Sequence, residues 1–326
     1  MSFTLPDLVA ICPFVCQRNP HYPDVSTKSS EWLLSFNVLD DAKRAHFTQV
    51  DYGLLTAYVY PTADEEHFKT CCDFINILFA LDDISDEMSS PDASQMMVNV
   101  AAKAMKDPQF DDGSPICAMI KQFTSHLEQM PPLACQRFVK HFEDYCLAVG
   151  EEATVREQRT FLDLESYKAL RRDNGCVRPC FDLFAYVLGV DLPKDILGHP
   201  MITSLYNNAL DMISWPNDLV SFAREHAMGH SRSNILSVLI EERNISLQEA
   251  ADETGILFKG LVDEFMNCKA NLPSFGSYWD GVIVQIVELL ESWVIGNIIW
   301  SFEASRYFGA DAGKVKNTLV VEMSSM

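Results

Sequence analysis

Apolar residues recur at helical spacing along most of this 326-residue chain, and this periodicity restricts the fold more than any other feature. Phe74, Leu78 and Leu81, for example, follow one another at the spacing of a helical turn. Similar periods run through residues 119–127, 138–147, 181–188, 205–222, 235–242, 247–268 and 281–307. Alternating Val, Ile and Thr runs bounded by turn dipeptides, the pattern of strands, are nearly absent. The sequence therefore predicts an all-α fold.

Clusters of Pro, Gly, Asp and Ser separate the periodic segments, as at residues 111–115, 131–132 and 198–200. No such break is long enough to be a linker, so we expect residues 1–326 to form a single-domain α-helical bundle. The proline-rich first 30 residues predict an extended strap with short helices, and the last ~15 residues predict a mobile tail.

The charge balance excludes several kinds of partner. Lys and Arg total 25 against 46 Asp and Glu, a formal charge of −21, which disfavours nucleic acid and anionic membranes. The most apolar late stretch, residues 282–300, is interrupted by polar side chains, so we expect a buried helix and no stable membrane anchor. The N-terminus lacks the pattern of a secretion signal, which predicts a cytoplasmic protein. Ten cysteines without CxxC pairs predict free, mostly buried thiols.

An aspartate-rich segment, DDISD at residues 82–86, ends the apolar stretch of residues 74–81. On a helix, Asp82 and Asp86 lie one turn apart and continue the apolar stripe that contains Phe79. Carboxylates on such a stripe are costly and repel each other, and a bound Mg²⁺ would remove both penalties. A helix end that enters solvent would give the same string, so this segment alone leaves both interpretations open.

A second set of oxygen donors lies far downstream. Asn217, Ser221 and Glu225 are spaced i, i+4 and i+8, so on a helix they drift only about 80° around the axis. An amide, a hydroxyl and a carboxylate in one column suit a hard cation. Arg224 lies about 20° to the other side of Asn217, where it could contact a diphosphate shared with the metal. The alternative is an ordinary polar helix face, but the flanking residues are apolar.

Together the two motifs resemble class I terpene synthases, most closely the fungal, basidiomycete-type sesquiterpene synthases. The resemblance extends over nearly the whole chain and implies the α-helical bundle of that family. It assigns metal binding to the aspartate-rich DDxxD/E motif and to the (N/D)DxxSxxxE triad, which here are Asp82, Asp83, Asp86, Asn217, Ser221 and Glu225.

The resemblance also assigns roles to residues outside the motifs. Those that would bind the diphosphate are Arg171, Arg224, Arg306 and Tyr307. Those that would contact the isoprenoid chain are Phe79, Gly175 and Trp300. Trp300 would belong to the helix that delivers Arg306 and Tyr307. One departure concerns Asn174, three residues after the diphosphate-sensing Arg171, where the family often has Asp. Asn can hold the arginine by a hydrogen bond but not by charge.

By resemblance, three Mg²⁺ ions would promote ionisation of farnesyl diphosphate, and the cation would then cyclise to a sesquiterpene hydrocarbon or alcohol with release of diphosphate. The family also suggests a homodimer. The polar, Gly-containing residues 226–234 predict a loop that orders on ligand binding. One alternative is a chain-elongating prenyl diphosphate synthase, although residues 217–221 read NDLVS instead of a second DDxxD. The other is a non-catalytic, acidic helical binding protein, which would release no diphosphate.

Overall fold

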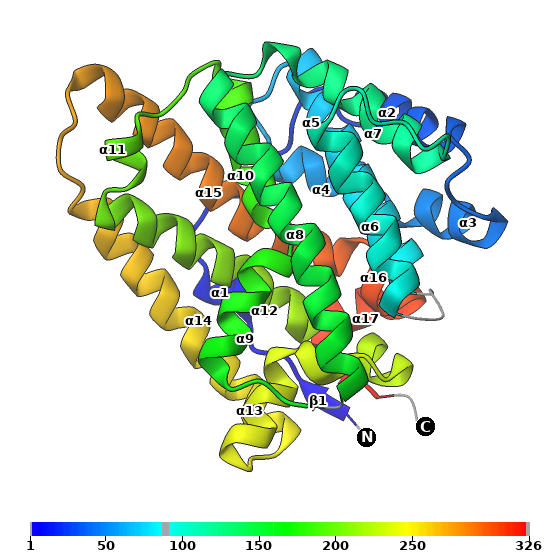
Figure 1. The fold of residues 1–326 in the computed structure, drawn as a ribbon. Helices are drawn as coiled ribbons and strands as arrows, with labels where there is room; N and C mark the ends of the chain where they lie inside the picture. The colour runs from blue at the N-terminus through cyan, green and yellow to red at the C-terminus, as the bar shows by residue number, and fades with distance from the viewer. Residues whose placement is uncertain (1, 87–90, 159, 324–326) are drawn as a thin grey trace. The chain divides into compact units, whose positions relative to one another are not determined.

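The computed structural model describes residues 2–86, 91–158 and 160–323, without the side chains of residues 86, 91–94 and 156. Helices dominate it, and the all-α prediction is confirmed (Figure 1). The α-helices are α1 (Leu8–Ile11), α2 (Asp24–Ser35), α3 (Asp41–Val50), α4 (Tyr52–Val59), α5 (Glu65–Asp86), α6 (Pro91–Lys106), α7 (Pro115–His126), α8 (Pro132–Gln158), α9 (Leu164–Asn174), α10 (Val177–Leu188), α11 (Lys194–Leu197), α12 (Pro200–Met228), α13 (Ile235–Arg243), α14 (Leu247–Ala270), α15 (Ser277–Glu303), α16 (Ser305–Phe308) and α17 (Ala312–Thr318). Short 3₁₀ turns are η1 (Leu127–Gln129), η2 (Ser231–Ser233) and η3 (Gly309–Asp311).

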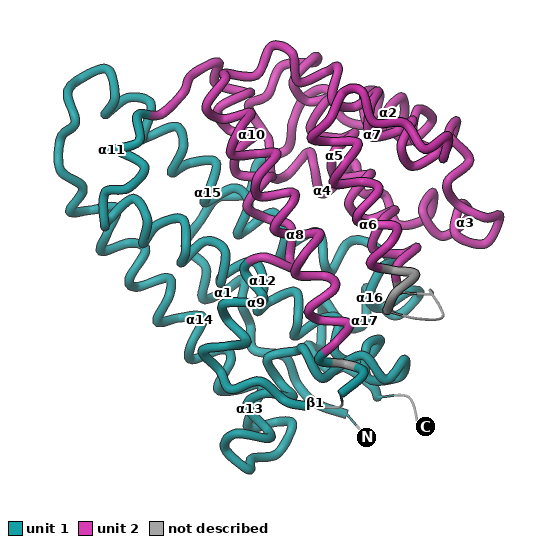
Figure 2. Tube along the Cα trace, viewed as in Figure 1, with its two compact units in different colours: residues 1–17, 155–172, 193–326 teal, residues 18–154, 173–192 magenta. Residues whose placement is uncertain are grey.

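The chain divides into two compact units (Figure 2). Unit 1 comprises Met1–Gln17, Val155–Arg172 and Pro193–Met326, and unit 2 comprises Arg18–Thr154 and Asp173–Leu192. Each unit is therefore assembled from segments that are far apart in the sequence.

Helix α12 is the central helix of unit 1 and packs against α13, α14 and α15. Its start is fixed by Pro200 in the first turn and by His199, whose side chain accepts a hydrogen bond from the Met201 amide. Gly229 ends it in the left-handed conformation at φ 77°, which costs a glycine little. Pro216 removes one internal hydrogen bond, yet the helix continues through it to Met228. The Asn217–Glu225 segment thus lies on one continuous helix, as predicted.

Helix α15 is long and apolar enough to cross a membrane by length and composition alone. A core helix of a soluble protein passes the same test, and 61% of its most apolar window is buried inside the protein. The helix expected over residues 281–307 is wrong at its C-terminal end. Ala304 is extended, with φ −80° and ψ 154°, and separates α15 from α16. Trp300 and Arg306 consequently lie on different helices.

Two short strands, β1 (Ser2–Thr4) and β2 (Val320–Glu322), join the ends of the described chain in unit 1. They pair antiparallel, with Phe3 opposite Val321, and both of these side chains are buried. The mobile tail expected for the last residues is therefore wrong for residues 312–322, which form α17 and β2. Apolar burial and β-sheet pairing with a distant segment hold the tail in place.

In unit 2, α5 packs against α2, α4 and α10. Its residue Phe74 is completely buried among Phe123, Phe138 and Phe142, with ring centroids 4.7–6.1 Å away. This aromatic cluster anchors the middle of the helix whose C-terminal end bears the aspartate-rich motif. The ten cysteines are free, and most are buried, which confirms their prediction as thiols.

Candidate active site

The C-terminal half of α12 presents the predicted oxygen column of Asn217, Ser221 and Glu225. The Ser221 hydroxyl, which is buried, donates to Oε1 of Glu225 at 2.5 Å. Nδ2 of Asn234, from the connection to α13, donates to Oε2 of Glu225 at 3.0 Å. Each oxygen of the Glu225 carboxylate therefore receives one hydrogen bond, and this carboxylate is oriented before any ligand binds.

Burial, together with the nearby negative charge of Asp218, raises the pKa of Glu225 to about 7. Hydrogen bonds from Ser221 and Asn234 act in the opposite direction but are weaker. A carboxylate in this position is costly to ionise without a cation. A divalent ion bound by Glu225, Ser221 and Asn217 would supply that cation, and its preferred ligands are oxygen atoms like theirs. The donor set therefore fits a hard divalent metal.

Asn217 brings together three predicted site residues from three helices of unit 1. Its Oδ1 accepts a hydrogen bond from Nη2 of Arg171 on α9 at 2.9 Å. Its Nδ2 donates to the hydroxyl oxygen of Tyr307 on α16 at 2.6 Å. Two of the four diphosphate-binding candidates, Arg171 and Tyr307, thus contact the first residue of the triad.

Sequence reasoning missed Asp218, whose side chain binds Arg171 and so helps to position it beside Asn217. Its carboxylate is almost fully buried, and Oδ1 accepts from Nε of Arg171 at 2.9 Å. Oδ2 accepts from the Tyr167 hydroxyl and from the Ile235 amide. A signal was present, because Tyr167 precedes Arg171 by one helical turn and Asp218 is an acidic residue directly before the apolar pair Leu219 and Val220.

The remaining candidates of unit 1 lie around the same helices. Arg306 is buried on α16, and Arg224 is half-buried beside Glu225 on α12. Trp300 is completely buried, and its ring stands edge-on to Tyr307 with 5.9 Å between centroids and 85° between planes. Trp300 therefore reaches the Tyr307 ring although the two residues belong to different helices.

In unit 2, the aspartate-rich motif occupies the C-terminal turn of α5. Asp82 and Asp83 are half-buried. The side chain of Asp86 lies outside the described residues. Tyr52 connects two candidates, since its hydroxyl donates to Oδ2 of Asp83 at 3.3 Å and its ring stacks on Phe79 at 4.1 Å.

Gly175 lies between α9 and α10 and is half-buried. Its neighbour Asn174 donates from Nδ2 to Oε2 of Glu152 at 2.8 Å. This hydrogen bond connects the C-terminal end of α9 to α8.

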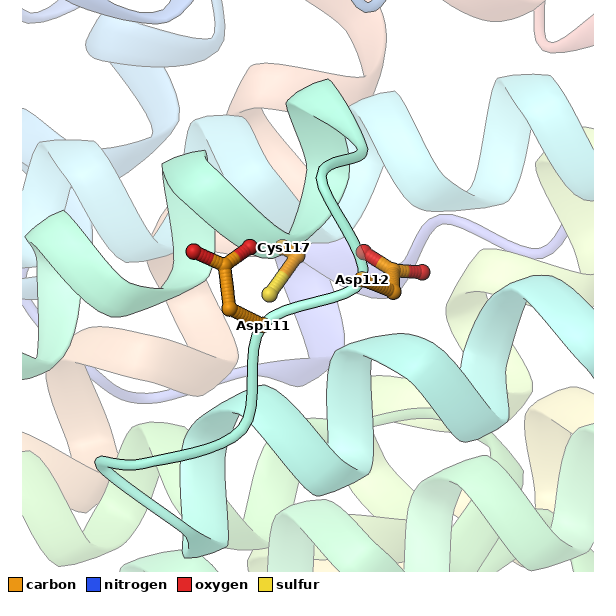
Figure 3. Close-up of side chains that lie close together, drawn as sticks. All are labelled: Asp111, Asp112 and Cys117. Atoms are coloured by element: carbon orange, nitrogen blue, oxygen red, sulfur yellow. The ribbon is translucent and has the colours of Figure 1, made fainter.

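A further cluster in unit 2, Asp111, Asp112 and Cys117, brings potential ligand atoms within 4.8 Å of one another (Figure 3). Backbone amides of the loop already bind both carboxylates of this cluster. Oδ1 of Asp111 accepts from the Gly113 amide, and Oδ1 of Asp112 accepts from the Ser114 amide, at 2.9 and 3.0 Å. Hydrogen bonds from the side chain and the amide of Ser114 lower the pKa of Asp112. The cluster thus shapes the turn before α7 and lies apart from both predicted motifs in the sequence.

Comparison with known proteins adds three findings. A family model described as "Terpene synthase family 2, C-terminal metal binding" matches residues 73–264, which include both motifs. A Coprinopsis cinerea protein named linoleate 10R-lipoxygenase COP4 is 38% identical over 99% of this chain and 93% of its own length. Sesquiterpene synthase 1 of Postia placenta is 36% identical over 99% of this chain and 95% of its own length.

Among solved structures, germacradien-4-ol synthase from Streptomyces citricolor superimposes with a TM-score of 0.79. The match covers 91% of this chain and 97% of that one at 22% sequence identity. At this identity the likeness concerns the fold, which it confirms as the all-α terpenoid synthase type.

Proposed function

Because the chain belongs to the terpene synthase family, we propose that it is a Mg²⁺-dependent sesquiterpene synthase that cyclises farnesyl diphosphate. The reaction class is that of a carbon–oxygen lyase acting on a prenyl diphosphate. The chain spans 95% of the length of the Postia placenta relative, which is named a sesquiterpene synthase. Membership and coverage together support transfer of the activity.

The observation that carries the proposal is the contact of Asn217 with Arg171 and Tyr307. The Asn217 amide accepts from the Arg171 guanidinium and donates to the Tyr307 hydroxyl, and both of these groups can donate to an anionic diphosphate. Ser221 and Glu225 continue the same column with a hydroxyl and a carboxylate. Acceptors for a cation and donors for an anion thus stand side by side within unit 1, which is what binding of a metal diphosphate requires.

We propose that the metals are Mg²⁺ ions, three in number, held by the triad and by the aspartate-rich motif of α5. Bound Mg²⁺ would neutralise charge on the departing diphosphate and so favour cleavage of the allylic carbon–oxygen bond. Arg171, Arg306 and Tyr307 would orient the diphosphate and stabilise its growing charge by hydrogen bonds. Buried aromatic rings such as Trp300 would stabilise the hydrocarbon cation and exclude water from it.

The lipoxygenase name of the Coprinopsis cinerea relative points to a different reaction. Non-haem iron for oxygen chemistry is typically held by imidazoles together with a carboxylate. The triad instead offers an amide, a hydroxyl and a carboxylate, which are ligands for Mg²⁺. The donor set therefore favours diphosphate chemistry in this chain.

Some properties of the protein belong to the proposal as well. We propose that the two units act as one catalytic domain, because the matched family region draws on both. The formal charge of −21 supports a protein without nucleic-acid partners and without a stable membrane anchor. A cytoplasmic homodimer is the state that we propose for it.

Incubation of the purified protein with farnesyl diphosphate and Mg²⁺, followed by gas chromatography and a diphosphate assay, tests the proposal. We expect cyclic C15 products and an equal amount of diphosphate. A longer prenyl diphosphate formed after addition of isopentenyl diphosphate would favour the chain-elongating alternative. Absence of turnover with prenyl diphosphates of every tested length would favour the acidic binding protein.

A further inference from the structure

The side chain of Glu225 depends on a residue outside its own helix. Glu225 stands in the last turn of α12, which ends at Met228. Ser221, one turn earlier, supports Oε1 from within the helix. Oε2 is supported at 3.0 Å by Asn234, which lies beyond the η2 turn. One oxygen of Glu225 is thus supported from within α12 and the other from the connection to α13, and the two hydrogen bonds together fix its rotamer.

Asn234 is itself fixed at both polar atoms, and its side chain is fully buried. Its Oδ1 accepts from the Leu236 amide at 3.0 Å and so caps the N-terminus of α13. Its Nδ2 donates to the Asp218 carbonyl at 2.8 Å and to Glu225. Because the oxygen is engaged by the cap, the amide nitrogen must face α12. Its two hydrogens thus join the backbone of α12 to the carboxylate of Glu225.

We propose that Asn234 is a positioning residue that holds Glu225 in the conformation in which Glu225 binds the divalent metal. This inference rests on the proposed function. The Asp218 carbonyl provides the fixed reference point, since it belongs to the helix turn between Asn217 and Ser221. Asn234 thereby sets the distance of the Glu225 carboxylate from the other two oxygen donors of the triad. A neutral donor is required for this, because a carboxylate at position 234 would repel Glu225.

The alternative is that Asn234 serves only as the helix cap of α13, and two substitutions separate the roles. The cap uses Oδ1, whereas positioning uses Nδ2. Asn234→Ser retains an oxygen for the cap but removes the amino group without adding charge. Asn234→Asp also retains the cap and places a negative oxygen toward Glu225. A matched control is Ser246→Ala, which removes the cap of α14, because Ser246 contacts Glu249 and belongs to no motif.

The experiment uses full-length, metal-stripped protein in the presence of inorganic diphosphate. The melting temperature is measured as a function of Mg²⁺ concentration, and the Mg²⁺ dependence of farnesyl diphosphate turnover is measured in parallel. Loss of a residue that supports a metal ligand typically weakens metal binding about 10–100-fold. We therefore expect both Asn234 variants to need about tenfold or more Mg²⁺ in both assays. Ser246→Ala should melt earlier without Mg²⁺ but need the same Mg²⁺ concentration as the wild type.

A second comparison tests whether Asn234 acts through Glu225. In a Glu225→Gln background, adding Asn234→Ser should change the Mg²⁺ requirement by less than about twofold, because both substitutions affect one interaction. The proposal is wrong if the effects of Asn234→Ser and Glu225→Gln on the Mg²⁺ requirement multiply in the double variant. It is also wrong if Asn234→Ser melts earlier with an unchanged Mg²⁺ requirement. A wild-type protein that responds to Mg²⁺ in neither assay would instead refute the proposed function, and the positioning role with it.

Discussion

Nη2 of Arg171 lies 2.9 Å from Oδ1 of Asn217, so the guanidinium is hydrogen-bonded directly to the first residue of the proposed metal triad. Nε of the same guanidinium lies 2.9 Å from Oδ1 of Asp218. Arg171 is therefore held by two consecutive residues of α12, and movement of this helix turn would move the arginine too. In the proposed function, metal binding and diphosphate binding would thereby be linked through one helix turn.

Metal removal gives the first prediction. We expect a strong chelator to abolish turnover of farnesyl diphosphate, because the oxygen column of α12 has the donors of a hard cation. Added Mg²⁺ in excess of the chelator should restore turnover, as measured by diphosphate release. Turnover that persists in chelator after dialysis would show that the motifs have another role.

Asn217→Leu gives the second prediction. The substitution keeps similar bulk but removes the metal-binding oxygen and the contacts with Arg171 and Tyr307. Turnover should fall roughly 100-fold or more, with little change in melting temperature, since Asn217 is only half-buried. A matched control on the same helix is Asn208→Leu, because Asn208 is buried and its Nδ2 has no hydrogen-bond partner in the described structure. Equal turnover of the Asn217 variant and the wild type would refute the ligand assignment.

Glu225→Gln gives the third prediction, which concerns pH. The folded-state pKa of about 7 exceeds the ordinary value of 4.5, so the folded protein binds the proton more tightly than the unfolded chain. Ionised Glu225 therefore costs stability above pH 4.5, and this cost grows until pH passes about 7. In metal-free protein, Glu225→Gln should raise the melting temperature at pH 8, by on the order of 2 °C, and raise it less at pH 5. An equal effect at both pH values would show that the carboxylate is not destabilised.

Trp300 gives the fourth prediction. The ring is fully buried beside Tyr307, so it can face the isoprenoid cation or only fill the core. If it stabilises the cation, Trp300→Phe should largely keep the product pattern, while Trp300→Leu should shift it toward acyclic products. Gas chromatography measures the ratio of cyclic to acyclic products, and the melting temperature reports any loss of stability from altered packing. A constant product ratio with parallel losses of stability in both variants would assign Trp300 to the core.

The connection after α12 gives the fifth prediction. The helix extends to Met228, so the predicted loop is shorter than residues 226–234 and consists of Gly229, His230, η2 and Asn234. We expect its amides to exchange hydrogen more slowly when Mg²⁺ and inorganic diphosphate are present. Peptides from α14 serve as the internal control. Unchanged exchange in the loop would argue against its ordering on ligand binding.

Helical periodicity predicted most of the fold, because it depends on neighbours three and four residues apart. The same local geometry made the column of Asn217, Ser221 and Glu225 visible in the sequence. Asp218 was missed because its side-chain partners lie 17 to 51 residues away, beyond what spacing on one helix can show. Asn234 was missed because its partners on α12, 9 and 16 residues away, belong to a different helix. The break at Ala304 lacks a Gly or Pro signal in the sequence, and the pairing of Val321 with Phe3 spans almost the whole chain.

The pairing of β1 with β2 has a practical consequence for engineering this chain. Neighbouring strands in a sheet are about 4.8 Å apart, so Ser2 and Glu322, which lie opposite each other, could be connected by a few residues. Joined in this way, the polypeptide would become a closed ring that can be reopened at an exposed loop to give circular permutants. Fusion partners attached at Ser2 and at Glu322 would likewise emerge from neighbouring points of the same small sheet.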